Sequence, residues 1–433
     1  MFSNKILGAG TFFVLLSACG LKPQHEAPHM PLDLSSNEYR TRLKSLKGSA
    51  LLEEGDDASV DYGFSEDDLK AVRDSLAMGE RSLKWTEYMN SFRDDATKLR
   101  LTTRAGGLHG IPIENPSRYS PSLVRARYEQ NVAQLDPVAK NILLGNGAFT
   151  QNPAISDEAF VELAKKIDRT YQTAARWQLV SPWLNYYESA SRRDVRGFYS
   201  LSRDTDIDNK LVNFEALPAA DRDLIASSLI TLCRNTGRSL SSCGGAFEGA
   251  RSAHDLRSLY ARDLPAGRTN WSSFFDISNA RRDISWSQKD PQSSHIPFRR
   301  SSDDLLTSFI KNNVEEEYSF KGLHFIFDLQ EADSPGEMPY VTFEAGSTPH
   351  VEGLGGNHIV MDANAPLTEW DVQWTIRHEF GHVLGLPDCY VEFFDPSARE
   401  MVNYQLDVTD LMCSRAGRMN DRILEELRSA YQR

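Results

Sequence analysis

Residues 378–389, HEFGHVLGLPDC, constrain the fold more than any other part of the 433-residue chain. His378 and His382 are four residues apart, and on a helix this spacing points both imidazoles to one side. Two imidazoles so placed reach one metal ion at about 2.0–2.1 Å. Gly385 suits the left-handed turn that ends a helix, and Pro387 prevents the helix from resuming. The stretch therefore predicts a helix that ends abruptly beside a metal site.

Two acidic residues complete this pattern. Asp388 follows His382 by six residues and offers a carboxylate oxygen, which zinc accepts. Glu379 occupies the position at which a His-Glu-x-x-His site places a carboxylate against water rather than against the metal. The alternative is an amphipathic helix with two solvated histidines, which leaves the glycine and the aspartate unexplained. His350 and His358 are weaker ligand candidates, because no fixed spacing links them to this helix.

The motif HExxHxxGxxD formed by these residues resembles that of the metzincin zinc peptidases, in the variant with aspartate as third ligand, as in snapalysin. The resemblance covers about residues 300–433. It implies one catalytic Zn²⁺, a mixed sheet, a zinc helix, a methionine turn at Met412 and a C-terminal helix after it. The implied activity is endopeptidase cleavage of a protein or peptide substrate by water that zinc activates, with Glu379 as the general base.

The same resemblance implies where substrate lies. In metzincins an antiparallel edge strand holds the substrate extended, and residues 357–362, NHIVMD, are the candidate here. The segment after the methionine turn lines the pocket for the residue that follows the scissile bond. Arg415 or Arg418 in that segment would then pair with an acidic side chain. The alternative for both arginines is that they face water.

One position departs from the family pattern. Many metzincins carry a tyrosine two residues after the turn methionine, and this chain has Ser414 there. A phenol that assists the oxyanion must therefore come from elsewhere. Tyr390 and Tyr404 are the candidates, and the sequence does not choose between them.

The first 19 residues, MFSNKILGAGTFFVLLSAC, contain Lys5 and then an apolar run from Ile6 to Leu16. Such a run is typical of a secretory signal and is too short to span a bilayer. The ending LSAC resembles the lipobox of bacterial lipoproteins, which implies a signal peptide over residues 1–18 and lipidation of Cys19. Plain cleavage near Ala18 is the alternative. Gly20, rather than an aspartate, follows this cysteine, and in that respect the chain resembles lipoproteins sorted to the outer membrane of diderm bacteria. We expect an exported, lipid-anchored protein of the cell envelope, with residues 19–35 as a flexible tether.

The cysteines and the net charge agree with export. Apart from Cys19 the chain has four cysteines, an even number in an oxidising compartment, and these allow three pairings. The sequence-local pairing is Cys233–Cys243 with Cys389–Cys413. If the metzincin resemblance holds, the second bridge joins the ligand loop to the methionine turn; zinc binding by Cys389 and free thiols are the alternatives. The net charge of −13 argues against nucleic acid as the main partner.

Residues 36–295 favour helices and predict a helical domain without any catalytic motif. Ser65 and Ser156 each precede an amphipathic run and predict helix N-termini. The whole chain is therefore predicted to be α+β, with a mostly helical N-terminal region followed by the metzincin-like domain at residues 300–433.

The polar, proline-containing segment 285–300 is interpreted as a linker. Arg299-Arg300 within it suggests a site of proteolysis, so that residues 36–295 would restrain the catalytic domain until cleavage; an uncleaved linker is the alternative. A capping box at Ser301 and Asp304 predicts the next helix. The alternation of apolar residues at 323–329 predicts a strand after it, and residues 340–344 and 358–362 favour two further strands.

Two other functions remain open at this point. One is a gluzincin-like peptidase whose third ligand is a later glutamate, Glu425 or Glu426, although this leaves Gly385 and Met412 unexplained. The other is a non-catalytic surface lipoprotein whose helical region binds a partner or cell-wall material.

Overall fold

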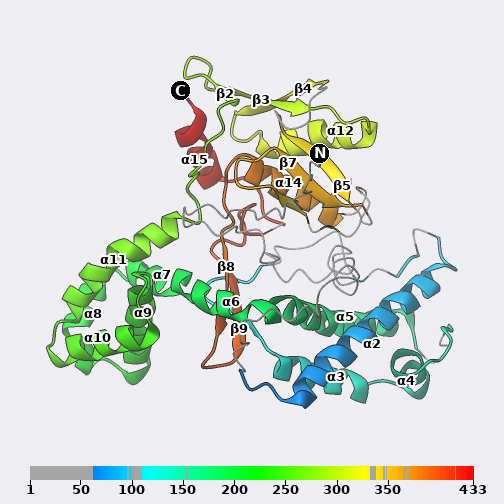
Figure 1. Cartoon of the computed structure of the whole chain (residues 1–433), viewed down its shortest axis with the longest axis horizontal. Helices are drawn as coiled ribbons and strands as arrows, with labels where there is room; N and C mark the ends of the chain where they lie inside the picture. Colours follow the sequence, from blue (N-terminus) through cyan, green and yellow to red (C-terminus); the bar gives the residue numbers. More distant parts are fainter. Residues whose placement is uncertain are drawn as a thin grey trace, which may run out of the picture.

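The computed structural model describes residues 62–94, 97–99, 101, 110–151, 155–331, 338–344, 347, 349–363, 367, 370–414 and 416–433. The predicted signal peptide, Cys19, the tether and Arg415 lie outside these residues. The fold is α+β, with a helical N-terminal region and three small sheets, most of whose strands come later in the chain (Figure 1).

The helices of the N-terminal region are α2 (Glu66–Asn90), α3 (Pro121–Ala133), α4 (Pro137–Leu144), α5 (Asp157–Val180), α6 (Leu184–Ala190), α7 (Arg196–Arg203), α8 (Ile207–Val212), α9 (Ala219–Arg234), α10 (Leu240–Ser252) and α11 (Leu256–Ser272). The Ser65 and Ser156 side chains accept hydrogen bonds from the third backbone N–H of α2 and α5, so both predicted N-termini are confirmed. Helices α2 to α5 lie together in Figure 1, and α7 to α11 form a second group beside them. The Cys233–Cys243 disulfide joins α9 to α10, with a Cα–Cα distance of 5.7 Å.

The three sheets have three strands each. The strands are β1 (Ser117–Tyr119), β2 (Ser285–Trp286), β3 (Ser293–Arg299), β4 (His324–Gln330), β5 (Tyr340–Glu344), β6 (His350–Val351), β7 (His358–Asp362), β8 (Tyr390–Asp395) and β9 (Glu400–Gln405). Their orders are β2-β3-β4, β5-β7-β6 and β1-β9-β8. Strands β3 and β4 are parallel, as are β5 and β7, whereas β6 runs antiparallel to β7. All three predicted strands are present, as β4, β5 and β7.

The interpretation of residues 285–300 as a linker is wrong, because this segment contains β2 and β3. Ile296 and Phe298 are buried, and the intervening Pro297 points away from the core. This alternation is only two apolar residues long, so the prolines and serines around it dominate the pattern. Strand β3 therefore pairs with β4 across the predicted boundary between the two domains.

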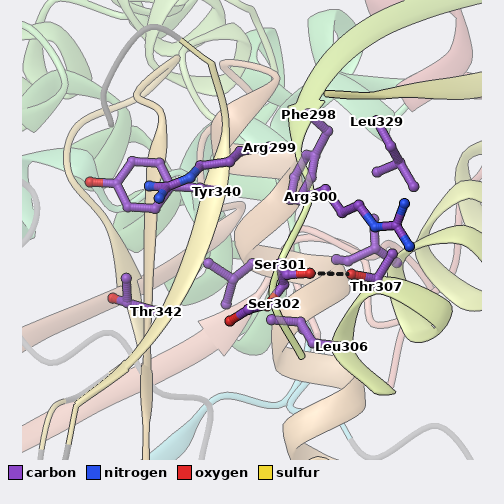
Figure 2. Close-up of a pocket in the computed structure, with 12 residues that line it drawn as sticks. Phe298, Arg299, Arg300, Ser301, Ser302, Leu306, Thr307, Leu329, Tyr340 and Thr342 are labelled. Carbon is purple, nitrogen blue, oxygen red and sulfur yellow. Dashed lines mark hydrogen bonds between the residues drawn. The ribbon is translucent and has the colours of Figure 1, made fainter. Parts of the chain in front are cut away.

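The proposed cleavage site at Arg299-Arg300 lies in paired backbone. The N–H of Arg299 donates to the carbonyl oxygen of Pro339 and that of Arg300 to Gln330, at 2.9 Å each. A cavity of about 180 Å³ lies between the end of β3, the start of β5 and α12 (Asp304–Phe309). Figure 2 shows both arginines among the residues that line it. The Arg299 guanidinium lies 5.6 Å from the ring centre of Tyr340. A protease needs extended, unpaired chain, so the structure does not offer this bond as a nicking site.

The remaining helices follow the early strands. They are α12, a π-helical turn (Ile310–Val314), α13 (Glu315–Tyr318), α14 (Trp370–Val383) and α15 (Asp421–Tyr431). The predicted capping box at Ser301 is incorrect: Asp303 caps α12, because its carboxylate accepts from the N–H groups of Leu305 and Leu306. Phe380 of α14 packs on the rings of Phe325 and Phe327, which fixes α14 against β4.

The helical region is joined to the later strands at two places. Strand β1, which precedes α3, pairs antiparallel with β9. Arg176 of α5 forms a buried ion pair with Glu392 of β8, which also accepts a 2.8 Å hydrogen bond from the Tyr119 hydroxyl. Among the described helices, none is both long and apolar enough to cross a membrane.

Candidate metal centre

The two histidines of α14 converge on one carboxylate. His378 and His382 lie one helical turn apart, and each residue keeps less than a tenth of its surface exposed. The Oδ1 atom of Asp388 lies 3.1 Å from Nε2 of His378 and 3.3 Å from Nε2 of His382. A ligand atom from each of the three residues lies within 4.8 Å of the other two. This is the cluster that the spacing predicts, formed by two residues of a helix and one from the loop after it.

Backbone carbonyls determine which imidazole nitrogen is available. Nδ1 of His378 lies 2.9 Å from the carbonyl oxygen of Leu411, and Nδ1 of His382 lies 2.8 Å from that of Leu386. A carbonyl oxygen only accepts hydrogen bonds, so each Nδ1 carries a proton. Both Nε2 atoms therefore face the centre of the cluster, in the arrangement that zinc-binding histidines use.

The helix ends where the third ligand requires it. Gly385 has φ of +80°, which favours glycine, and its N–H donates to the carbonyl of His382. The next N–H, that of Leu386, donates to the carbonyl of Gly381 at 3.0 Å, which completes a Schellman turn. A Cβ at Gly385 would also lie 3.0 Å from the backbone oxygen of Asn279. The turn sends the chain back toward the helix, so that Asp388 reaches the histidines.

Electrostatics tie the three ligands together. Burial alone lowers the pKa of His382, but the Asp388 carboxylate outweighs it and raises that pKa to about 9. Burial alone raises the pKa of Asp388, and the two imidazoles outweigh it and hold that pKa well below its usual range. Without a metal, the cluster is thus an ion pair between an imidazolium and a carboxylate. A divalent cation supplies the positive charge that a proton otherwise supplies.

Glu379 lies beside these ligands. The residue is 7% exposed, and its negative charge is among the causes that raise the pKa of His382. It does not belong to the cluster of converging ligand atoms found among the described residues. Its place agrees with a carboxylate that acts on water near the metal rather than on the metal itself.

Met412 packs beneath α14. The side chain is fully buried, and a Cβ added at Gly381 would clash with its sulfur. The glycine between the two histidines is thus required for this contact. Asp410 holds the turn, because its Oδ1 accepts the Met412 N–H at 2.8 Å and its Oδ2 accepts from Asn420 and Arg422. Asp410 is fully buried, and no pattern in the sequence indicates its role.

A disulfide joins the ligand loop to this turn. Cys389 and Cys413 are bonded, with a Cα–Cα distance of 4.4 Å, so both sequence-local pairs are present. The N–H of Cys389 also donates to the carbonyl of Met412 at 3.1 Å. Asp410 lies next to both sulfurs, but sulfurs committed to a disulfide are not thiolate ligands. The alternatives of a zinc-binding Cys389 and of free thiols are not supported.

Of the two tyrosines, only Tyr390 lies at the cluster. Its hydroxyl is 3.2 Å from Oδ2 of Asp388. Tyr404 is fully buried and donates to Asp194 at 2.8 Å while accepting from the N–H of Val195. Burial and the Asp194 carboxylate hold the pKa of Tyr404 well above its usual range, which suits a structural hydroxyl.

The other predicted ligands are engaged elsewhere. His358 lies 2.7 Å from the Thr342 hydroxyl and stacks on Tyr340. Neither His350 nor His358 belongs to the metal-binding clusters among the described residues. The same is true of Glu425, which is exposed, and of Glu426, which accepts from the N–H of Ile277.

The candidate substrate strand is corrected. Strand β7, residues His358–Asp362, is the central strand of its sheet: it pairs with β5 along its whole length and with β6 at Ile359 and Val360. The antiparallel strand at the edge of this sheet is β6 instead. It precedes β7 and is too short for its pattern to be recognised in the sequence.

Arg418 already has a partner. Its guanidinium donates to Glu317 at 2.6 Å and is 67% exposed on the side-chain scale. The Glu317 side chain is 6% exposed, also pairs with Arg377 of α14, and accepts the Met419 N–H. Arg377 and Arg418 line a cavity of about 410 Å³ next to α14. Arg377 and Glu317 were missed by the sequence reasoning, since their pairing joins residues that are far apart in the chain.

Comparison of the chain with protein-family models, with curated proteins and with solved structures found no match.

Proposed function

We propose that this protein is a zinc-dependent endopeptidase with a metzincin-like catalytic domain. The observation that carries the proposal is the convergence of His378, His382 and Asp388, with both Nδ1 atoms bound to carbonyls and Glu379 beside the cluster. Two imidazoles and one carboxylate are a donor set that catalytic zinc accepts, with a fourth position left for water or substrate.

Features outside the ligand set support the same class. Gly385 turns the chain after the helix, Met412 packs below it, and the predicted C-terminal helix is present as α15. The face of α15 that carries Ile423, Leu424 and Leu427 is buried. The antiparallel edge strand that would hold an extended substrate is β6 (His350–Val351).

Zinc, when bound, acidifies water and polarises a peptide carbonyl. Glu379 accepts the proton from the attacking water and returns it to the leaving amine. Tyr390, whose hydroxyl lies next to Asp388, is the candidate donor to the developing oxyanion. The Leu386 and Leu411 carbonyls orient the two imidazoles throughout the reaction.

The cellular setting is part of the same proposal. Export as a lipoprotein attached through Cys19 would place the peptidase at the cell envelope. The disulfides Cys233–Cys243 and Cys389–Cys413 support an oxidising compartment.

A peptide-library assay on the purified protein tests the function. We expect hydrolysis that a zinc chelator abolishes and that added zinc restores. Asp388→Ala should show neither hydrolysis nor restoration, whereas Glu425→Ala, which alters an exposed glutamate of α15, should behave as wild type. Loss of zinc in Glu425→Ala but not in Asp388→Ala would favour the gluzincin-like alternative. A wild-type protein that binds zinc and cleaves no library peptide would favour the non-catalytic one.

A further inference from the structure

A polar cavity of about 520 Å³ lies between α3, α5 and β1, in the helical region. This volume is within the range of small-molecule binding sites. We call the part of this cavity lined by the following residues the anion pocket: Arg127, Asn131, Gln134, Lys166, Arg169 and Thr173. Among its described lining residues none is acidic, although the chain as a whole has a net charge of −13.

Three cations of this pocket have no carboxylate partner among the described residues. Arg127 donates to the Thr173 hydroxyl at 3.2 Å, and Lys166 donates to the Gln134 amide oxygen at 2.9 Å. Arg169 is exposed at the same cavity, and no ion pair involves it within the described chain. A fourth cation of the lining, Arg118, is neutralised by Glu400 at 3.3 Å.

Neighbouring cations on the same helices do have partners. Arg125 of α3 pairs with Asp68 and Glu129, and Lys165 of α5 pairs with Glu162. The lack of partners is therefore confined to the side of α3 and α5 that faces the cavity. Like charges meet there: partial burial lowers the pKa of Arg127, and the nearby positive charge of Arg169 lowers it further.

The floor of the pocket is polar and ordered. Asn131 and Thr173 are almost fully buried, and the Asn131 amide donates to the Thr170 hydroxyl at 2.9 Å. These side chains, with Gln134, offer hydrogen bonds to an uncharged polar part of a ligand. The walls offer two guanidinium groups, which bind tetrahedral oxyanions through paired N–H donors.

We propose that the anion pocket binds a phosphate group, carried by a small soluble molecule or by a lipid headgroup. A phosphate monoester carries up to two negative charges, so it matches three unpaired cations better than a single carboxylate does. Arg127 and Arg169 hold the phosphate oxygens, and Lys166 adds charge beside them. This site is independent of the proposed peptidase function, because it lies on helices that carry none of the metal ligands.

Titration of the full-length protein with inorganic phosphate at low ionic strength, followed by calorimetry, tests the soluble source. We expect saturable binding that weakens as sodium chloride is raised. Arg127→Gln and Arg169→Gln should each weaken it about tenfold, as expected for loss of a charge-assisted hydrogen bond. Arg125→Gln and Lys165→Gln are the matched controls, since they remove the same charge from the same helices outside the pocket.

Sedimentation with phosphatidylcholine vesicles that contain phosphatidic acid, whose headgroup is a phosphate monoester, tests the lipid source. Vesicle binding that Arg127→Gln and Arg169→Gln reduce, and that the controls do not, supports the pocket and assigns the phosphate to a lipid headgroup. Two results overturn the proposal: no saturable binding of either probe, or equal losses in the pocket variants and the controls. Arg127 and Arg169 are exposed, and Arg125 and Lys165 are only half-buried, so circular dichroism should show all four variants folded.

Discussion

The metal centre is built from residues that lie close together in the sequence, whereas the sites of the helical region combine residues that are far apart in it. All residues of the metal centre, from the first histidine to the second cysteine of its disulfide, lie between residues 378 and 413. The helical region instead brings together side chains from separate helices, as in the anion pocket of α3 and α5. Helix α5 serves both regions, because its Arg176 reaches Glu392 of β8, two residues beyond Tyr390. The metal centre is therefore local in sequence, but the helices that support it are brought to it only by the tertiary structure.

The largest effect tests that support. Removing one partner of a buried ion pair leaves an uncompensated charge, so Arg176→Ala should lower the free energy of unfolding by about 3–5 kcal/mol. Arg73→Ala, which breaks the exposed pair with Glu66, should cost no more than about 1 kcal/mol. Chemical denaturation measures both. Equal small losses would mean that Arg176 does not join the helical region to β8.

The two disulfides sharpen the comparison, since one lies in each region. Each closes a loop of at most about 25 residues, and replacing either pair by serine should cost about 3 kcal/mol of stability. Zinc affinity should fall about tenfold only when Cys389 and Cys413 are replaced, because that bridge supports the ligand loop. Denaturation and zinc titration of both double variants provide the comparison. Equal zinc affinities would show that the bridge near the metal only stabilises the fold.

The next largest effect is the loss of zinc-binding free energy when the ligand Asp388 is removed. Asp388→Ala should weaken zinc binding by more than about 100-fold, since even residues that only orient ligands contribute 10–100-fold. Competition with a chromogenic chelator measures this affinity. Unchanged affinity would show that Asp388 is not a ligand. The turn at Gly385 would then not serve to bring a third ligand to the metal.

The smallest effect concerns specificity. Arg418 is exposed and already paired with Glu317, so its influence on a substrate side chain is screened. If it contacts the residue after the scissile bond, Arg418→Ala should reduce cleavage before acidic residues by no more than about fivefold. Library profiles of wild type and variant test this. A wild type without any acidic preference ends the idea for both arginines, whereas a preference that Arg418→Ala leaves unchanged would point to Arg415.

The sequence was most informative where short-range geometry decides the structure. Helical spacing located the two histidines, a left-handed glycine located the turn, and short apolar runs located β4, β5 and β7, with a period-two pattern in β4. It failed where long-range pairing decides. Strand β3 was interpreted as a linker because Ile296 and Phe298 are its only strong apolar signals, and pairing with β4 stabilises it.

The candidate site shows the same limit. The three ligands and Glu379 follow from their spacing, whereas the choice of Tyr390 over Tyr404 required the contact with Asp388. Asp410 was missed because its partners, Asn420 and Arg422, reach it only after α15 folds back.

The most direct test of the account is the hydrolysis of peptides by Glu379→Ala, measured together with its zinc content. Glu379 handles protons and is not a ligand, so the variant should keep about one zinc per chain. Its hydrolysis rate should fall by about 100-fold or more, the usual contribution of a general base. Loss of zinc together with activity would instead make Glu379 a ligand or a structural residue. Hydrolysis at the wild-type rate, with zinc bound, would contradict the proposed mechanism.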